Sequence, residues 1–261
     1  MRIGFFEEFP DEKNLGRLRL IGFPIDLYIA AKSLSDFRKI RKQLLDKKSF
    51  GKKIRSIIYW PVLEEDEGYW MSPLSRRKAL KRIIDELKNS KEKIKVLWDA
   101  EFPIKKENWK KELHNFLRNR ILIRGFIKKA SSYNKEIITA EYPLEGFFFR
   151  FLFRFMALSF NPKRFKHKKI GMVYTSMVQN RAVGHYLESQ IAKGREEYGT
   201  SYCAGLGVIG KGILNNEKEL TNRELKRDLG IAKKHRVGNV ILYRLGGIDK
   251  KKADIIKKFL N

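Results

Sequence analysis

The chain has 261 residues, of which 43% are hydrophobic and one is cysteine, and its formal net charge is +27. The hydrophobic content excludes a disordered chain, and a single cysteine excludes both an internal disulfide and a cysteine-based metal cluster. The sequence contains no run of about 18 uncharged apolar residues, and acidic residues come early at its N-terminus; we therefore expect a cytoplasmic protein without a membrane-spanning helix or signal peptide.

The net charge favours anionic partners, such as nucleic acid, phosphorylated ligands, acidic glycans or an anionic membrane surface. A lysine-rich solvated surface explains the same charge, because the 57 Lys and Arg residues are spread along the chain. We do not expect nucleic acid as the partner, since no helix-turn-helix, zinc-finger or RNA-recognition signature is present. The four histidines are far apart in the sequence, so we predict no histidine-based metal site and no bound cofactor.

The predicted strands are short apolar runs that are rich in β-branched or aromatic residues. They are residues 2–6, 17–23, 54–60, 94–99, 136–141, 169–175, 201–208 and 239–245. Most of these runs are apolar at nearly every position, which is typical of a parallel sheet covered on both faces.

Helical patterns separate most of the predicted strands. They cover residues 26–49, 73–90, 108–133, 180–197, 222–236 and 249–260. Ser72 is the expected N-cap of the second helix, with Pro73 at its first position. Thr221 and Glu224 form the capping-box pattern of the fifth helix. The residues between 6 and 17 are too few for a full helix.

Eight strand–helix units in about 260 residues match the usual size of a (β/α)8 barrel. We therefore predict an α/β fold, a single TIM-barrel domain over residues 1–261 with a short or missing first helix. An open doubly wound sheet is the alternative, but the GxGxxG fingerprint of its dinucleotide-binding form is absent after the first strand.

Three predicted strands end in a carboxylate, an aromatic residue and proline. These segments are EEFP at 7–10, DAEFP at 99–103 and AEYP at 140–143. Because the active sites of such barrels lie at the C-terminal ends of the strands, these carboxylates predict an acidic site. The alternative is structural, since carboxylates after a strand also cap the next helix or pair with Lys and Arg.

Asp99 and Glu101 are two residues apart in an extended segment, so both side chains point to one face, with Cα atoms ~6.5 Å apart. Repulsion and partial burial would raise the pKa of one of them. A protonated carboxyl beside an ionised one is the arrangement that glycosidic cleavage uses. We predict Glu101 as the proton donor and Asp99 as the residue that tunes it. Glu141 or Glu8 is the predicted second carboxylate.

Aromatic residues near the same strand ends would supply flat apolar surfaces on which sugar rings pack. Trp60 and Tyr174 are the predicted substrate-binding residues of this kind. Further candidates are Trp70, Trp98, Phe102 and Tyr142. The first hypothesis is therefore an enzyme that acts on carbohydrate.

The segment DAE at 99–101 resembles the end of the DxE motif of family 18 chitinases and barrel-type lysozymes. This resemblance implies that Glu101 is the general acid and that Asp99 orients the substrate or supports the glutamate. The segment GMVYTSM at 171–177 is similar to the Met-x-Tyr segment of chitinases, which implies that Tyr174 faces the substrate. The larger clan of retaining glycosidases has a nucleophilic glutamate at the seventh strand, and no acid stands there in GLGVIGKG at 205–212.

Glycine-rich segments follow the seventh and eighth predicted strands, at 205–212 and 244–247. Loops at these places hold phosphate in many (β/α)8 enzymes through backbone N–H groups. A second hypothesis is therefore an enzyme or binder for phosphorylated small molecules. A divalent metal held by the carboxylates is an optional part of this hypothesis. Its predicted binding residues are Gly210, Lys211, Gly212 and Arg244. Alternatively, the glycines only form turns.

The segment EGFFFRFLFRFMALSF at 145–160 is the most apolar stretch of the chain. It has too many large apolar residues for a simple surface helix of a barrel. Three roles fit this composition: a subunit interface, a peripheral contact with a membrane surface, or a core helix that neighbouring elements cover.

The third hypothesis for the function of the whole chain follows from its net charge. It is a protein that binds nucleic acid or an anionic surface.

Overall fold

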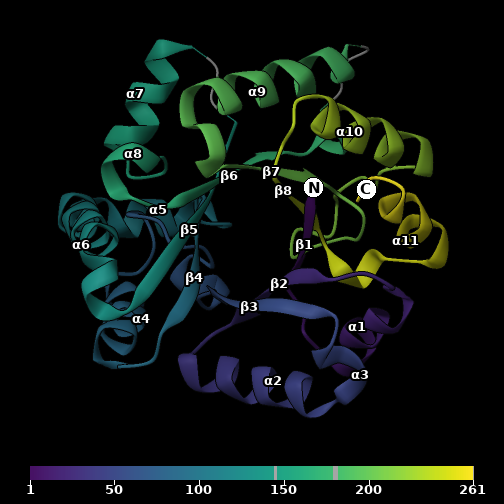
Figure 1. Ribbon diagram of the computed structural model, residues 1–261. Coiled ribbons are helices and arrows are strands. Elements are labelled where there is room, and N and C mark those ends of the chain that lie inside the picture. The colour runs from purple at the N-terminus through teal and green to yellow at the C-terminus, as the bar shows by residue number, and fades with distance from the viewer. Residues whose placement is uncertain (144–145, 179–181, 261) are drawn as a thin grey trace. The chain divides into compact units, whose positions relative to one another are not determined.

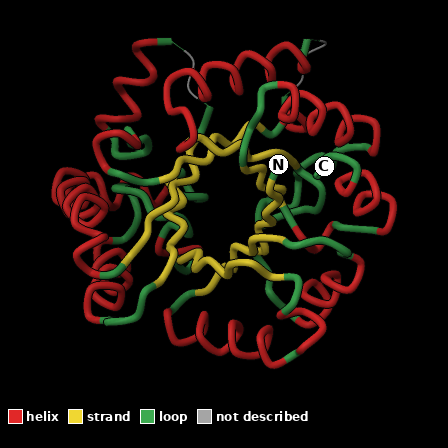
Figure 2. The backbone as a smooth tube through the Cα atoms, viewed as in Figure 1, coloured by secondary structure: helices red, strands yellow, loops and turns green. Residues whose placement is uncertain are grey.

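The computed structural model describes residues 1–143, 146–178 and 182–260. Eight parallel strands pair in chain order and close into a barrel, with helices between the strands (Figures 1 and 2). The predicted (β/α)8 fold is therefore confirmed. As predicted, the first helix is short, with only five residues.

The strands cover most of the predicted apolar runs. They are β1 (Arg2–Glu7), β2 (Ile25–Ala31), β3 (Ile54–Pro61), β4 (Ile94–Ala100), β5 (Lys135–Glu141), β6 (Lys168–Val173), β7 (Tyr202–Gly207) and β8 (Asn239–Tyr243). Seven of them coincide with predicted strands to within a few residues, and the exception is β2.

The helices of the described ranges follow the strands in alternation. The α-helices are α1 (Glu12–Gly16), α2 (Leu34–Asp46), α3 (Lys48–Gly51), α4 (Arg77–Asn89), α5 (Lys106–Glu112), α6 (Phe116–Lys129), α7 (Phe147–Phe155), α8 (Pro162–Phe165), α9 (Val183–Tyr198), α10 (Asn222–Lys234) and α11 (Lys250–Lys257). Short 3-10 helices are η1 (Arg17–Leu20), η2 (Glu65–Glu67), η3 (Leu113–Asn115), η4 (Ala130–Tyr133), η5 (Thr175–Met177), η6 (Gly199–Ser201) and η7 (Leu245–Gly247).

The predicted second strand is wrong. Most of the run 17–23 forms η1 and the turn after it, and the strand β2 occupies the start of the predicted helix 26–49. Leu27, Ala30 and Ala31 fit a helical spacing, but β2 pairs in register with β1 and is buried along nearly its whole length. An apolar run that is buried on both faces has no periodicity to separate a strand from a helix.

Of the two helix N-termini predicted from capping residues, one is confirmed and the other is wrong. The capping box of α10 is confirmed, because Glu224 accepts a hydrogen bond from the Thr221 N–H at 2.8 Å and the Thr221 hydroxyl accepts one from the Glu224 N–H at 3.3 Å. Ser72 does not cap α4, which begins at Arg77; its hydroxyl instead accepts from the Leu74 N–H within a turn. Residues 180 and 181 of the predicted helix 180–197, and residues 144 and 145, lie outside the described residues.

The chain divides into two compact units. The first contains Met1–Ala30, Lys39–Ile57 and Ile170–Asn261, and the second contains Ala31–Arg38 and Ile58–Lys169. Within each unit the strands lie on the inside and the helices on the outside (Figure 2).

In the first unit, the strand register shows which side chains face the barrel interior. Tyr202 of β7 lies against Gly194 of α9 and so faces the helices. Gly207 follows five residues later and therefore faces the side of the sheet opposite to the helices. Tyr243 of β8 is the register partner of Gly207. Phe6 of β1 is in turn paired with Tyr243. Phe6 and Tyr243 therefore face the barrel interior.

In the second unit, two aromatic contacts identify the helix-facing side. Trp98 of β4 packs against Phe126 of α6 with ring centroids 5.7 Å apart, and Tyr59 of β3 packs against Phe37 of α2 at 5.0 Å. Both strand residues are fully buried. The neighbouring residue in each strand therefore points to the interior side.

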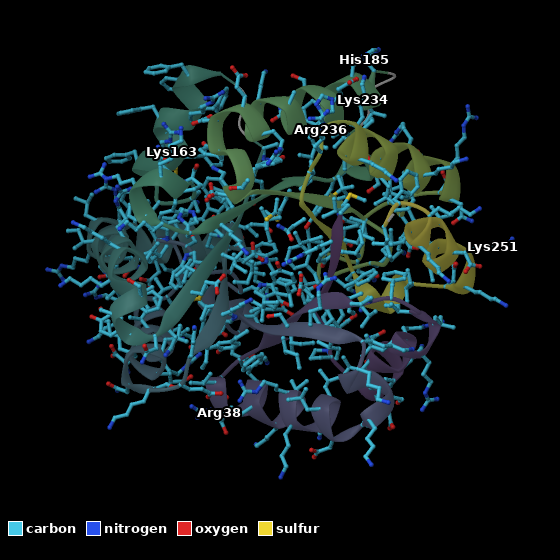
Figure 3. The ribbon with its side chains drawn as sticks, in the orientation of Figure 1. Arg38, Lys163, His185, Lys234, Arg236 and Lys251 are labelled. Carbon is cyan, nitrogen blue, oxygen red and sulfur yellow. The ribbon has the colours of Figure 1, made fainter. Side chains whose placement is uncertain are left out.

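Much of the positive charge lies on the outer helices, where it is solvated or paired. Lys251 on α11 points away from the strands (Figure 3). Lys32 and Glu64 form one of the exposed ion pairs, with 2.6 Å between Nζ and Oε2. Such pairs contribute little to stability, so they fit a solvated basic surface. In the described ranges, no helix has the length and apolar content that a membrane crossing requires.

His167 is a buried titratable group of the second unit. Its ring lies near those of Phe160 and Phe165, and neither ring nitrogen has a hydrogen-bond partner among the described residues. Burial lowers the pKa of His167 to about 4, with Lys169 acting in the same direction. The folded protein therefore holds this imidazole neutral at pH values where the unfolded chain protonates it.

We expect the replacement His167→Phe to flatten the acid side of the stability profile. Because the folded pKa lies below the unfolded value of 6.5, wild-type stability is lost as the pH falls from 6.5 towards 4. Between pH 7 and pH 5 this loss amounts to roughly 2 kcal/mol from His167 alone. Chemical denaturation of both proteins at each pH measures it, and equal losses in the two proteins would contradict the assignment.

Candidate active site

The end of β4 carries two carboxylates. Because Trp98 faces the helices, Asp99 points to the interior side of the strand, and Glu101 follows two residues later. Asp99 is buried, with 3% of its surface exposed, and Glu101 is half-buried. β4 thus places one carboxylate inside the barrel and the next at its end, both on the interior side.

Tyr142, directly after β5, connects these two carboxylates. Burial, the negative charge of Glu101 and a hydrogen bond to Glu101 raise the pKa of Tyr142, and the charge of Asp99 adds to the rise. The phenol therefore stays protonated and donates its hydrogen bond to the Glu101 carboxylate. The Phe102 N–H donates to the Tyr142 oxygen at 3.4 Å, which completes a short chain of hydrogen bonds.

A cluster of aromatic rings lies beside Glu101. Phe102 stacks on Trp109 of α5 with ring centroids 4.9 Å apart, and Tyr142 and Phe153 lie within about 6 Å of Phe102. The Trp109 indole N–H donates to the Pro103 carbonyl at 2.9 Å, which orients the ring. Trp109 and Phe102 are both partly exposed, so this cluster offers apolar ring faces next to a carboxylate.

Glu141 lies on the other face of the sheet. It is the register partner of Ala100, whereas Asp99 pairs with Ala140, so Glu141 points to the helix-facing side. Its fully buried carboxylate accepts from the Thr139 hydroxyl at 2.6 Å and from the Phe160 N–H at 3.1 Å, and it pairs with Lys169 at 2.6 Å. These contacts place the Glu141 carboxylate, which we predicted as a second carboxylate, on the opposite side of the sheet from Asp99.

The predicted aromatic residues of the second unit differ in orientation. Trp60 follows the helix-facing Tyr59 in β3, so it points to the interior side, where it is buried. Trp98 packs on α6 and presents no surface to a ligand. Trp109 and Phe153, which sequence reasoning did not select, complete the cluster around Phe102, and only their aromatic character near a strand end could have indicated them.

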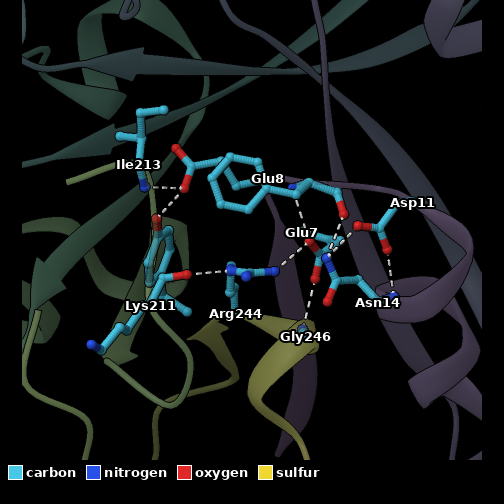
Figure 4. A network of polar contacts seen from close by, with 10 residues as sticks. Glu7, Glu8, Asp11, Asn14, Lys211, Ile213, Arg244 and Gly246 are labelled. Atoms are coloured by element: carbon cyan, nitrogen blue, oxygen red, sulfur yellow. Dashed lines mark hydrogen bonds and ion pairs between the residues drawn. The ribbon is translucent and has the colours of Figure 1, made fainter. Parts of the chain in front are cut away.

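In the first unit, Glu8 lies within a polar network at the ends of β1 and β8 (Figure 4). Its Oε2 atom accepts from the Tyr243 hydroxyl at 2.5 Å and from the Ile213 N–H at 2.9 Å. Burial and the charge of Glu8 raise the pKa of Tyr243. Two donors on one oxygen stabilise the ionised form of the Glu8 carboxylate.

Aromatic rings surround this carboxylate on the interior side. Tyr243 lies between Tyr174, at 5.6 Å, and Phe6, at 6.1 Å, and Phe6 contacts Tyr28 at 5.3 Å. Tyr174 was predicted to face the substrate, and the structure places it half-buried beside Tyr243. The first unit thus places the Glu8 carboxylate next to a group of tyrosine and phenylalanine rings.

Glu7 points to the opposite side of β1 and binds the loop after β8. Its carboxylate accepts from Arg244 Nη1 at 2.8 Å, from the Gly246 N–H at 2.7 Å and from the Phe9 N–H at 2.9 Å (Figure 4). Burial raises the pKa of Glu7 to about 7, although the Arg244 charge and these hydrogen bonds oppose the rise. Arg244 is therefore engaged with Glu7 and also lies over the ring of Phe9 at 4.7 Å.

The glycine-rich loop after β7 packs tightly against the protein. A side chain at Gly210 would collide with Gly247, and one at Gly212 would collide with the Tyr243 hydroxyl and Glu8. The Lys211 carbonyl accepts from Arg244 Nε at 2.6 Å, while its own side chain is exposed. Close packing explains these two glycines without a bound phosphate.

Several backbone N–H groups of the two loops already have acceptors. Those of Ile213 and Gly246 donate to Glu8 and Glu7, and the Val208 N–H donates to the Ser176 hydroxyl at 2.9 Å. Glu7 and Glu8, at the end of β1, thus occupy donors that a phosphate would need. Over the described residues, no group of three or more His, Cys, Asp or Glu side chains is arranged to hold a metal ion.

No model of a known protein family matches this sequence, and no curated protein matches it.

Solved structures nevertheless share the fold over the whole chain. A GH18 chitinase from Pseudoalteromonas aurantia has a TM-score of 0.59 and 10% identity, with 100% of each chain covered. The PgaB (BpsB) glycoside hydrolase domain from Bordetella bronchiseptica has a TM-score of 0.57 and 11% identity, covering 99% of this chain and 97% of that one. A xylose isomerase domain protein from Planctomyces limnophilus has a TM-score of 0.57 and 8% identity, covering 98% and 96%. At these identities the likeness extends to the fold alone.

We expect Lys169→Met to destabilise the protein by about 3–5 kcal/mol, because it leaves the buried Glu141 carboxylate without its counter-charge. Lys168→Met is the matched control, since its neighbour Lys168 is 45% exposed and lies 3.9 Å from Glu136. We expect the control to change stability by less than about 1 kcal/mol. Chemical denaturation measures both, and similar effects of the two replacements would contradict the structural role of Glu141.

Proposed function

We propose that the protein hydrolyses glycosidic bonds, with Glu101 as the general acid. The observation that carries this proposal is the group of Asp99, Glu101 and Tyr142 at the ends of β4 and β5, with aromatic rings beside it. The comparisons support a barrel fold that glycoside hydrolases share, and isomerase-related proteins share it as well.

The proposed role of Glu101 follows from its surroundings. A general acid must hold a proton near neutral pH and give it to the leaving oxygen. The negative charge of Asp99 on the same side of β4 opposes a second negative charge on Glu101, whereas the hydrogen bond from Tyr142 favours the Glu101 carboxylate. Once the proton has left, the Tyr142 hydroxyl stabilises the resulting carboxylate by its hydrogen bond.

The proposed substrate is an oligosaccharide. The partly exposed rings of Phe102 and Trp109 beside Glu101 supply apolar faces on which a sugar ring can pack. The hydrogen bond from Trp109 to Pro103 holds that surface in a fixed orientation. The aromatic surface favours a neutral sugar or an aminosugar, because the negative charge of the neighbouring carboxylates would repel an anionic sugar.

Glu8 of the first unit remains our prediction for the second carboxylate. Hydrogen bonds from Tyr243 and from the Ile213 N–H favour its ionised form, which a base or a nucleophile requires. Tyr174, beside Tyr243, remains a predicted substrate-binding residue on the same unit. Arg244 is engaged with Glu7 and has no role in this proposal. Lys211 and Arg244 belong to the alternative hypothesis of a phosphorylated ligand.

We expect Glu101→Gln to lower the rate of oligosaccharide hydrolysis by about 10²–10⁴-fold, the usual contribution of a general acid. Stability should stay near the wild-type value, because glutamine keeps the shape and the hydrogen-bonding capacity of the side chain. Glu107→Gln, at an exposed position of α5, is the matched control and should leave the rate unchanged. A near-normal rate for Glu101→Gln would remove the proposal.

Ligand-induced stabilisation tests the substrate class independently of turnover. We expect oligosaccharides or aminosugars to raise the free energy of unfolding by about 2.7 kcal/mol at a hundred times their dissociation constant. Denaturant titrations with a panel of neutral oligosaccharides, aminosugars and phosphosugars, each with and without magnesium, measure this effect. Stabilisation by phosphosugars alone, or only with magnesium, would instead favour a site at the loops after β7 and β8.

A further inference from the structure

The helix α7 exposes an unusual number of large aromatic side chains. Phe147, Phe148 and Phe151 are 89%, 69% and 63% exposed, and Phe149 and Phe155 are also exposed. Phe153, by contrast, packs on Phe102 and Tyr142. Phe153 thus attaches the helix to the protein, while five other phenylalanines of the same helix are exposed. A group of exposed apolar side chains of this size on a protein surface indicates an interaction site.

A cluster of arginines lies next to these rings. A surface pocket of about 270 Å³ is lined by Arg120 and Arg124 of α6, Arg154 of α7 and Arg164 of α8, together with Phe151 and Phe155. The labels of Figure 1 show α7 and α8 side by side. The arginines and the exposed phenylalanines thus share one surface of the second unit.

Contacts with α7 hold this cluster in place. Arg120 Nε donates to the Phe155 carbonyl at 2.5 Å, and Arg124 Nη1 donates to the Arg154 carbonyl at 3.2 Å, at the C-terminal end of the helix. The Arg120 guanidinium also lies 4.9 Å from the centre of the Phe155 ring. Each guanidinium has five N–H donors, so donors remain for an anionic partner.

The sequence around this pocket contains two stretches whose charges are all positive. Residues 113–135 and 146–166 contain six and five Lys or Arg residues and no Asp or Glu. Burial lowers the pKa of Arg124, and the positive charges of Arg120 and Arg164 lower it further. Like charges are therefore brought together at this pocket, and an anion placed among them would relieve their repulsion.

We propose that α7 and the arginines beside it dock the protein on an anionic lipid bilayer. The phenyl rings enter the boundary between headgroups and acyl chains, and the arginines bind lipid phosphate groups. This pairing of an aromatic face with a basic rim is the composition that helices lying in the membrane interface use. The chain would thereby bind peripherally to a membrane surface.

Other occupants of this surface fit the observations less well. A second copy of the chain would bring a basic patch of the same sign against this one if the interface were isologous, and each chain carries a net charge of +27. Single-stranded nucleic acid would stack on aromatic rings that form a flat platform. At the helical spacing, Phe147, Phe148, Phe151 and Phe155 instead share one side of α7, an arrangement that suits insertion of this side into the membrane interface.

Vesicle sedimentation tests the proposal. We expect the full chain to sediment with vesicles of phosphatidylglycerol and phosphatidylcholine, to bind pure phosphatidylcholine at least tenfold more weakly, and to lose binding as salt is added. The double variant Phe148→Ser with Phe151→Ser should lose at least tenfold in affinity, as should Arg120→Gln with Arg164→Gln. Unfolding curves establish that each variant is folded.

Matched controls separate this surface from general effects of charge and hydrophobicity. Leu45→Ser on α2, where the leucine is 52% exposed, and Lys251→Gln on α11 should bind vesicles like the wild type. Equal loss in these controls, or unchanged binding by both double variants, would overturn the proposal. It would also be overturned if the phenylalanine variant changed only the oligomeric state, or only the binding of single-stranded DNA.

Discussion

Alternation of side chains along a strand decides which acidic residues of this protein can take part in chemistry. At the end of β4 it places Asp99 and Glu101 on the interior side, and at the end of β5 it places Glu141 on the side of the helices. The same rule separates Glu8 from Glu7 after β1. Neighbouring carboxylates thus have different surroundings in the structure, although their sequence surroundings are alike.

The acids on the helix-facing side stabilise the fold. Glu141 joins β5 to the loop before α8 and pairs with Lys169, while Glu7 fixes the loop after β8 through Arg244 and the Gly246 N–H. Removing a buried carboxylate from water costs several kcal/mol unless donors surround it, and both sites provide them. The loops after β7 and β8, which resemble an anion site in sequence, are bound instead by Glu8 and Glu7 of the protein itself.

Sequence reasoning predicts the barrel because seven strands are marked by apolar runs and turns. It misplaces β2, since Leu27, Ala30 and Ala31 fit either period once both faces are buried. It also predicts that the side chains of Asp99 and Glu101 point to the same side, because this depends only on their two-residue spacing. The orientation of Glu141 depends on strand register, and the contact of Trp109 with Phe102 depends on how α5 packs. Neither is available from local sequence.

The proposed role of Glu101 is tested most directly by comparing two substrates. An aryl glycoside with a good leaving group needs little protonation, whereas an unactivated oligosaccharide depends on the general acid. If Glu101 donates the proton, Glu101→Gln will lower kcat/KM for the oligosaccharide by about 10²–10⁴-fold and for the aryl glycoside by far less. An equal loss for both substrates would show that Glu101 is not the proton donor.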